Sequence, residues 1–292
     1  MSVRRLMRVA LATALLCSFS VSLSGASTPP KISASAPCGA VHSTTYTHVV
    51  WILLENQGYS VVGSPNAPYF NELSNRCALA TNYFAISHPS LPNYVALTSG
   101  STQGIADDGE PSTHRLAVPS IFSELGSKWR TLAESMPGRC DHVTSGVYAA
   151  RHNPAVYYTN IAPACQRNDV PLTTPLNLSA EFTMIVPNVC HDMHSCPVAD
   201  GDSWLKRFVS LIVQSPQYQS RSLVLFITFD ENDLDASNQV PTLVISPSTP
   251  RGLRVGAKFT HYSLLRTTEN LLHLAPLAGA KRAPSMVSPF HL

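Results

Sequence analysis

The chain has 292 residues, enough for one α/β domain with a sizeable core. Its formal net charge is only +2 at pH 7 and no run of basic residues occurs, so composition gives no electrostatic basis for binding nucleic acid or an anionic membrane surface. After the first 26 residues no apolar stretch is long enough to span a bilayer, which argues against a stable membrane anchor.

Residues 1–26 have the pattern of a cleaved secretory signal. Basic residues at the start are followed by an apolar run at residues 9–16 and by small residues that end at Ala26. Cys17 suggests a lipid-anchored cysteine as an alternative, but the leucines directly before it do not suit lipoprotein processing. The sequence therefore predicts a secreted, extracellular protein with a signal peptide at residues 1–26, a Ser/Pro/Ala-rich leader at residues 27–45 and a single domain at residues 46–292.

Six cysteines follow this signal, and an even number in an exported chain favours disulfides over free thiols. Local spacing favours one disulfide between Cys140 and Cys165 and another between Cys190 and Cys196, which leaves Cys38 to pair with Cys77. A zinc knuckle is the alternative for residues 190–196, which contain two thiols and two imidazoles. An oxidising compartment disfavours thiolate ligands.

Strand and helix patterns alternate along the domain. Nearly continuous apolar residues, as at 47–54 and 223–229, are typical of strands buried on both faces of a parallel sheet. In chain order the patterns predict a strand at 47–54, a helix at 68–76, a strand at 79–86, a helix after Ser90, a helix at 120–128, a strand at 182–186, a helix at 202–214, strands at 223–229 and 240–246, and a helix at 261–274. This order predicts an α/β fold with a mostly parallel sheet sandwiched between helices.

Ser90 lies where a strand pattern changes to a helix pattern. Pro89 disfavours a helical conformation of His88, and Pro92 fits the first turn of a helix, so Ser90 is predicted at or beside a helix N-cap. Unpaired backbone N–H groups and the helix dipole favour a phosphate at such a place. A purely capping role for Ser90 is the alternative.

Polar residues follow three of the apolar strands, in Glu55-Asn56, in residues 188–194 and in Asp230-Glu231. The ligand crevice of an open α/β sheet lies beyond the carboxyl ends of its strands, so these residues are predicted to face one pocket together with Ser90. Carboxylate and amide oxygens suit a hard divalent cation, and histidines suit zinc or another transition metal. Such an ion would activate the serine for attack on phosphorus, with later hydrolysis of a phosphoserine. A strand-end turn and a solvated acidic loop are the alternative interpretations of the two acidic motifs.

The order of these motifs resembles the bacterial phosphoesterase family of secreted acid phosphatases and phospholipases C, a branch of the alkaline phosphatase superfamily. The matching stretches run in family order between residues 47 and 274. They are LENQGYS at 54–60, APYFN at 67–71, HPSLPNY at 88–94, RHNP at 151–154, PN at 187–188 with DMH at 192–194, GDSWL at 201–205, FDE at 229–231 with NQVPT at 238–242, and THY at 260–262.

The resemblance implies an alkaline-phosphatase-like fold and a phosphate monoester as the substrate. Within the family the likeness is greatest to small secreted acid phosphatases that act on phosphatidylinositol 3-phosphate, so a phosphoinositide is a candidate. It also implies a divalent metal ion, Ca, Mg, Mn or Zn, as cofactor, and Ser90 as the nucleophile and a further metal ligand. The residues similar to the family's other metal ligands are Glu55, Asn56, Asp230, Glu231 and His261.

Further residues are assigned to the substrate. His88 and His152 are interpreted as contacting phosphate or protonating the leaving group. The other substrate-binding candidates are Asn93, Arg151, Asn188, Asp192 and His194. The match around Asn188 and Asp192 is loose, which leaves a second metal open. A turn hydrogen bond is the alternative for His88, and a loop held by the local disulfide is the alternative for His191 and His194.

Three other functions fit parts of this pattern. A secreted serine esterase lacks support because no Gly-x-Ser-x-Gly motif occurs, and Gly201-Asp202-Ser203 falls at the start of an amphipathic helix. A phospholipase C-type phosphodiesterase is the alternative within the family, and the short chain favours monoester hydrolysis over it. A catalytically silent binding protein is the third, against which the presence of Glu55, Ser90 and Asp230 argues.

Overall fold

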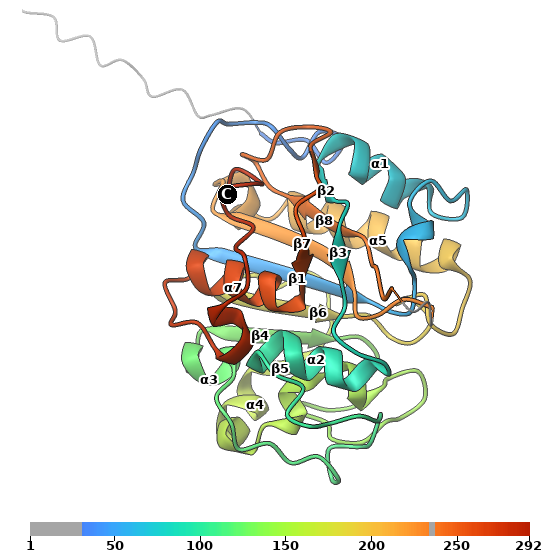
Figure 1. Ribbon diagram of the computed structural model, residues 1–292, viewed down its shortest axis with the longest axis vertical. Helices are drawn as coiled ribbons and strands as arrows, with labels where there is room; N and C mark the ends of the chain where they lie inside the picture. The colour runs from blue at the N-terminus through green and yellow to red at the C-terminus, as the bar shows by residue number, and fades with distance from the viewer. Residues whose placement is uncertain (1–30, 234–236) are drawn as a thin grey trace, which may run out of the picture. The chain divides into compact units, whose positions relative to one another are not determined.

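The centre of the structure is a mixed sheet of eight strands in the order β5-β4-β6-β1-β7-β8-β2-β9 (Figure 1). This sheet belongs to one compact unit, residues Ile32–Leu292. The computed structural model describes residues 31–233 and 237–292, so the signal peptide expected at residues 1–26 lies outside the described residues. The strands of this sheet are β1 (His48–Leu54), β2 (Ala78–Ala80), β4 (Trp129–Ala133), β5 (Asp169–Pro171), β6 (Phe182–Val186), β7 (Leu223–Phe229), β8 (Thr242–Ile245) and β9 (Arg254–Val255). A separate pair joins β3 (Tyr83–Phe84) and β10 (Phe259–Thr260).

The two most apolar strands, β1 and β7, are neighbours at the centre of the sheet. They pair in parallel with Leu54 opposite Phe229, and β6 pairs with β1 on its other side. Both strands are buried almost throughout, as their continuous apolar sequences predict. Only β8 breaks the parallel order, because it runs antiparallel to both of its neighbours, β7 and β2. The predicted mostly parallel α/β fold is therefore confirmed.

Helices pack against the sheet and against one another. The α-helices are α1 (Pro68–Arg76), α2 (Ser90–Ser99), α3 (Ile121–Leu125), α4 (Ala162–Asn168), α5 (Val198–Val213), α6 (Pro216–Gln219) and α7 (His261–Leu271), and short 3₁₀ helices include η2 (Ala150–His152) and η3 (Pro154–Tyr157). Helix α2 contacts α7 and lies beside it in front of the sheet, and α1 contacts α5 (Figure 1). The Trp51 indole of β1 donates a 3.0 Å hydrogen bond to Thr268, which fixes α7 on that face.

Two predicted elements differ from the structure. The strand predicted at 79–86 is two short strands in different sheets, because β2 pairs with β8 while β3 pairs with β10. The helix predicted at 120–128 ends at Leu125, and the strand β4 that follows at Trp129–Ala133 was not predicted. Gly126 has a φ of 60°, a left-handed conformation that stops the helix and suits glycine.

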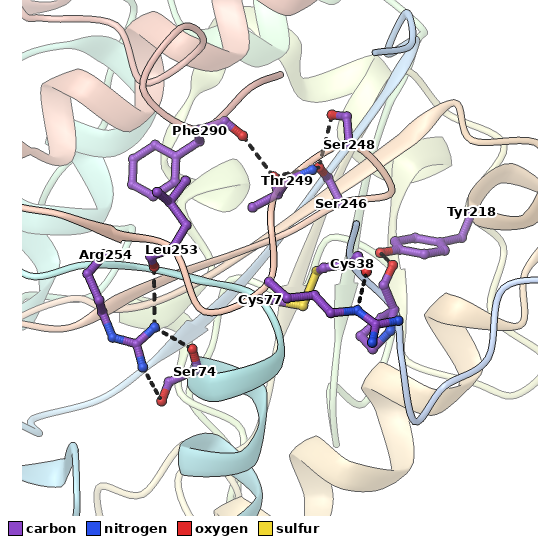
Figure 2. Close-up of a disulfide and its surroundings, with 12 residues drawn as sticks. Cys38, Ser74, Cys77, Tyr218, Ser246, Ser248, Thr249, Leu253, Arg254 and Phe290 are labelled. Atoms are coloured by element: carbon purple, nitrogen blue, oxygen red, sulfur yellow. Dashed lines mark hydrogen bonds between the residues drawn. A yellow bond between two sulfur atoms is a disulfide. The ribbon is translucent and has the colours of Figure 1, made fainter. Parts of the chain in front are cut away.

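Three disulfides join the predicted partners, Cys38 with Cys77, Cys140 with Cys165 and Cys190 with Cys196. The first ties the N-terminal segment to the end of α1, where Tyr218 also donates a 2.8 Å hydrogen bond to the Pro37 carbonyl (Figure 2). The third occupies both thiols of the alternative zinc knuckle, which excludes it. None of the described helices has both the length and the apolar composition that a membrane span requires.

Candidate active site

Glu55 and Asp230 leave the sheet side by side. They directly follow Leu54 and Phe229, which face each other in the β1–β7 register, and the Asp230 N–H donates a 2.9 Å hydrogen bond to the Leu54 carbonyl. Both side chains are fully buried. The convergence predicted from strand topology therefore occurs, because two adjacent parallel strands end at the same edge.

Ser90 is the first residue of α2, as expected, and its hydroxyl points into this acidic cluster. Its Oγ donates hydrogen bonds to Glu55 Oε2 at 2.9 Å and to Glu231 Oε1 at 3.1 Å, and the N-cap residue of α2 is Pro89. The second Glu231 oxygen contacts His88 Nδ1. The structure thus joins Ser90, Glu55, Asp230, Glu231 and His88 in one cluster, hereafter the acidic cluster.

Burial and mutual repulsion raise the pKa values of these carboxyl groups. Burial, followed by repulsion from Asp230 and Asp192, raises the pKa of Glu55 well above its usual range. Burial and then repulsion from Glu231 act in the same way on the pKa of Asp230. Burial also raises the pKa of Glu231, against the opposing effect of His88. Carboxylates crowded together in this way require a compensating positive charge if they are to ionise.

His152 extends the cluster to a fourth carboxylate. Its Nε2 lies 3.4 Å from Glu55 Oε1 and its Nδ1 lies 3.2 Å from Asp192 Oδ2. Neither ring nitrogen makes a well-aligned hydrogen bond, and burial, with Arg151 and His194 as weaker causes, lowers the pKa of His152 well below its usual value. A neutral imidazole with free nitrogens beside two carboxylates is a donor arrangement that suits a metal ion.

The residues present fit a divalent cation. The site contains four buried carboxylates, and within the described residues the only ion-pair partners of these groups are His88 and His152. Several buried atoms that could bind a metal ion have no hydrogen-bond partner, namely Asn56 Oδ1, Asp230 Oδ2, Asp192 Oδ2 and both nitrogens of His152. Buried polar atoms normally have hydrogen-bond partners, so this concentration of unpaired oxygen and nitrogen atoms is the observation that favours a metal ion.

The helix N-terminus around Ser90 differs from the prediction of free N–H groups. The Leu91 N–H already donates a 2.9 Å hydrogen bond to Asp108 Oδ1, and Pro92 has no N–H to offer. Asp108 comes from a loop whose residue pattern predicts no function. It occupies the position at the helix N-terminus that a phosphate was expected to take.

Asn93 and His261 are placed differently from their predicted roles. The Asn93 amide accepts from the N–H groups of Ile86 and Ser87 and donates to the carbonyls of Ser87 and Pro89, so it holds the turn before Ser90 and has no free group for substrate. His261 Nε2 bonds to the Asp230 carbonyl at 2.5 Å and its Nδ1 to the Tyr83 hydroxyl at 3.1 Å. With both nitrogens engaged, His261 positions Asp230 in this structure and is not free to bind a metal.

Asp192 and His194 lie in the loop closed by the Cys190–Cys196 disulfide, and Asn188 lies two residues before it. Asn188 accepts from two backbone N–H groups of this loop and donates to Ser135, so its amide organises the loop. His194 is exposed, with its ring centroid 6.2 Å from that of His152. Gly201 permits α5 to approach the loop closely, because a Cβ there would lie only 2.4 Å from Met193 Cγ.

Two predicted residues remain, the substrate-binding candidate Arg151 and Ser203 of the alternative esterase motif. Arg151 Nε is buried without a hydrogen bond, 3.9 Å from Asp108 Oδ2, so its guanidinium is close to the site. Ser203 is exposed on α5 and donates a 2.9 Å hydrogen bond to the Ala199 carbonyl. An exposed serine held by its own helix is not an esterase nucleophile, so the alternative built on Gly201-Asp202-Ser203 is wrong.

Tyr94 is a site residue that the sequence interpretation missed. Its hydroxyl donates to Glu55 Oε1, and its ring stacks on His152 with centroids 5.4 Å apart and an interplanar angle of 8°. The signal was available, because Tyr94 follows Ser90 by four residues and therefore shares its helix face. Asp108 had no such signal, since its contact depends on a long loop.

Asp169 supports the segment that carries His152 and gives a test of the buried charges there. Both Asp169 oxygens accept from the Asn153 amide, and burial raises the pKa of Asp169 to about 7 from 3.8. Because the folded-state pKa is the higher one, the stabilisation is complete below about pH 4 and is lost as the pH rises through 7. Asp169→Asn is expected to flatten the decline of unfolding free energy between pH 4.5 and 7.5, by up to about 1.4 kcal/mol per pH unit, in denaturant titrations. Equal slopes for both proteins would contradict this assignment.

Comparisons with known proteins agree with the geometry. The family profile described as Phosphoesterase family matches residues 59–275. A phosphatidylinositol-3-phosphatase from Mycobacterium tuberculosis is 32% identical over 247 residues, which cover 82% of this chain and 81% of that protein. A phosphate-repressible acid phosphatase from Penicillium chrysogenum is 27% identical over 79% of this chain and 60% of its own length, so this chain spans about three fifths of that relative.

Among solved structures, a protein in the alkaline phosphatase superfamily from Vibrio parahaemolyticus is similar in fold. Its TM-score is 0.53 at 13% identity, and the match covers 84% of this chain and 72% of that chain. At this identity the likeness concerns the fold alone. It places the strand ends around Glu55 and Asp230 within an alkaline-phosphatase-like architecture.

Proposed function

This chain belongs to the phosphoesterase family, and from that premise we propose that it is a secreted, metal-dependent phosphomonoesterase of the acid phosphatase type. The family assignment makes it a phosphoric ester hydrolase and confirms the resemblance of its motifs. Metal dependence is supported by the position of the Ser90 hydroxyl between Glu55 and Glu231, in a cluster of buried carboxylates where several oxygen and nitrogen atoms have no hydrogen-bond partner.

The residues around Ser90 have separate tasks in this proposal. Glu55, Asp230, Glu231 and the Asn56 amide would hold a divalent cation, Ca, Mg, Mn or Zn, and His152 with Asp192 would complete its ligands or hold a second ion. A bound cation would lower the pKa of the Ser90 hydroxyl and offset negative charge on the phosphoryl group. Asn93 keeps the turn before Ser90 rigid, and Tyr94 orients Glu55 through its hydroxyl.

Two successive displacements at phosphorus account for the reaction, and each forms one P–O bond and breaks another. Ser90 Oγ attacks phosphorus as the ester oxygen leaves, and the serine proton passes to a neighbouring carboxylate. His88 has its Nδ1 on Glu231, while its Nε2 is buried without a hydrogen bond and can deliver a proton to the departing alkoxide. Water then attacks the phosphoserine and releases phosphate; as the P–Oγ bond breaks, the carboxylate returns its proton to Ser90 Oγ, and the proton lost by the water restores His88. Arg151 is placed to contact the phosphoryl oxygens.

A phosphoinositide is the substrate that we propose first. The support is the mycobacterial relative, whose name specifies phosphatidylinositol 3-phosphate and which matches this chain over 81% of its own length. Secretion is supported by three disulfides and by the signal pattern at residues 1–26. A phosphodiesterase of the phospholipase C type remains the alternative within the family. Comparing a chromogenic phosphomonoester with the corresponding choline phosphodiester distinguishes the two activities.

Metal removal is the direct test of the proposal. The purified mature protein is expected to hydrolyse p-nitrophenyl phosphate, and dialysis against a chelator is expected to lower the rate at least about tenfold, because the carboxylates lose the cation that holds them together. Adding back Ca, Mg, Mn and Zn one at a time identifies the ion. Full activity in the chelated protein, with metal content verified by elemental analysis, would remove metal from the mechanism.

A further inference from the structure

A cavity of about 620 Å³ is lined by residues close in the chain to Asp108 and His152, but by none of the residues of the acidic cluster. Its walls are mostly apolar and include Pro111, Val156, Tyr157 and Tyr158, and the Cys140–Cys165 disulfide contributes both cysteines. Cavities of about 300–1,000 Å³ with apolar walls typically bind small organic ligands. Nothing in the proposed phosphoryl chemistry uses this space.

Two segments of the chain link residues of the active site to walls of the cavity. Glu110 lines it two residues after Asp108, whose carboxylate bonds to the Leu91 N–H next to Ser90. Ala155 lines it three residues after His152. Because three extended residues span at most about 11 Å, both walls begin within one headgroup's reach of the site. The Tyr157 hydroxyl ties the two segments together through a 2.8 Å hydrogen bond to the Gly109 carbonyl.

Two exposed side chains line the cavity, an apolar valine and an arginine without an ion-pair partner among the described residues. Val143 lines the cavity and is 64% exposed, and the other exposed large hydrophobic residue among those described is Val147, in the same loop. Arg115 also lines the cavity and is exposed, and its guanidinium makes no hydrogen bond or ion pair within the described residues. Glu110, in contrast, is engaged by the Thr144 hydroxyl at 2.6 Å.

We propose that this cavity binds the acyl chains of a glycerophospholipid substrate while its phosphomonoester lies at Ser90. Arg115 faces the phosphodiester that joins the headgroup to glycerol, and Val143 contacts the chains at the entrance. This inference rests on the proposed phosphomonoesterase function and assigns a second binding region to the lipid substrate proposed for it. The polar headgroup, which joins the phosphomonoester at Ser90 to the phosphodiester at Arg115, would lie along the two segments that link the active site to the cavity.

The test uses a probe that cannot react. Dihexanoyl phosphatidylinositol, kept below its micelle concentration, has the chains and the phosphodiester but no phosphomonoester. Titration calorimetry is expected to show saturable binding to the intact protein and at least about tenfold weaker binding to Ala162→Trp, because Ala162 is an exposed cavity residue at the start of α4 and the indole would fill the space. Ala199→Trp, an exposed alanine in the first turn of α5 that does not line the cavity, is the matched control and should bind as the intact protein does.

Two further variants separate the contributions and guard against misfolding. Val143→Glu, at an exposed position, is also expected to weaken binding at least about tenfold. Arg115→Gln is expected to weaken binding of dihexanoyl phosphatidylinositol several-fold while leaving dihexanoylglycerol unchanged, since only the former carries the anion. Absence of saturable binding to the intact protein, or unchanged binding to both Ala162→Trp and Val143→Glu, would overturn the proposal.

Kinetics distinguish failure of this inference from failure of the proposed function. With p-nitrophenyl phosphate, Ala162→Trp should retain kcat/KM within about twofold, whereas with dihexanoyl phosphatidylinositol 3-phosphate it should lose at least about tenfold. Equal losses on both substrates would also reject the acyl site. An intact protein that hydrolyses no phosphomonoester would reject the proposed function, and the calorimetric result would still decide whether the cavity binds the lipid.

Discussion

Replacing Ser90 with alanine is expected to lower the turnover of p-nitrophenyl phosphate at least about a hundredfold, because the variant cannot form the phosphoserine. Ser90 is only 2% exposed, and the two carboxylates that it contacts are also held by other groups, Glu55 by the Tyr94 hydroxyl and Glu231 by His88, so the replacement should leave them in place. Steady-state kinetics at saturating substrate give the comparison. Mass spectrometry of acid-quenched intact protein should detect a phosphate adduct on the unmodified chain and none on the variant.

Ser99→Ala is the matched control. Ser99 is equally buried at the other end of α2, where its hydroxyl donates to the Val95 carbonyl, and its replacement should leave turnover within about twofold. A Ser90→Ala protein with near-native turnover would show that Ser90 is not the nucleophile. Loss of turnover without any phosphate adduct on the intact chain would instead favour direct attack by water.

Asp230→Asn is expected to have opposite effects on activity and on stability. Turnover should fall at least about a hundredfold, since the variant loses a proposed ligand next to Glu55. At pH 8 and without metal, the melting temperature should rise by about 2–4 °C, because burial and the neighbouring Glu231 raise the pKa of Asp230, which makes this carboxyl group costly to fold at a pH above its ordinary pKa. Added cation should stabilise the unmodified protein much more than the variant. Calorimetry with and without metal measures both differences.

Asp202→Asn provides the contrasting control. Asp202 is also buried, but its two oxygens accept from the N–H groups of Tyr69 and Phe70 at the start of α1, at 2.9 and 2.8 Å. Its replacement should lower the melting temperature, since a charge-assisted helix cap is weakened, and should leave the response to metal intact. If both variants were destabilised alike and both still responded to metal, Asp230 would be a structural residue.

The sequence was sufficient for features that depend on local pattern or on strand order. The apolar strands β1 and β7, the disulfides and the family motifs were all readable, since each is encoded by residue type and spacing. The convergence of Glu55 and Asp230 was also predictable, because parallel strands bring their carboxyl ends to one edge. The position of Ser90 at the start of α2 followed from the neighbouring prolines.

Only the tertiary structure decided how the polar groups around these residues are used. Asn93 and His261 belong to the family motifs, yet every hydrogen-bonding group of the Asn93 amide and both His261 nitrogens are taken by backbone or by Tyr83. Asp108 contacts the N-terminus of α2 from a loop that has no recognisable sequence pattern. His152 lies next to Asp192, which comes from a separate segment of the chain. The physical reason is that motif and periodicity specify which groups a segment offers, whereas the partner of a buried polar group depends on which distant segment packs against it.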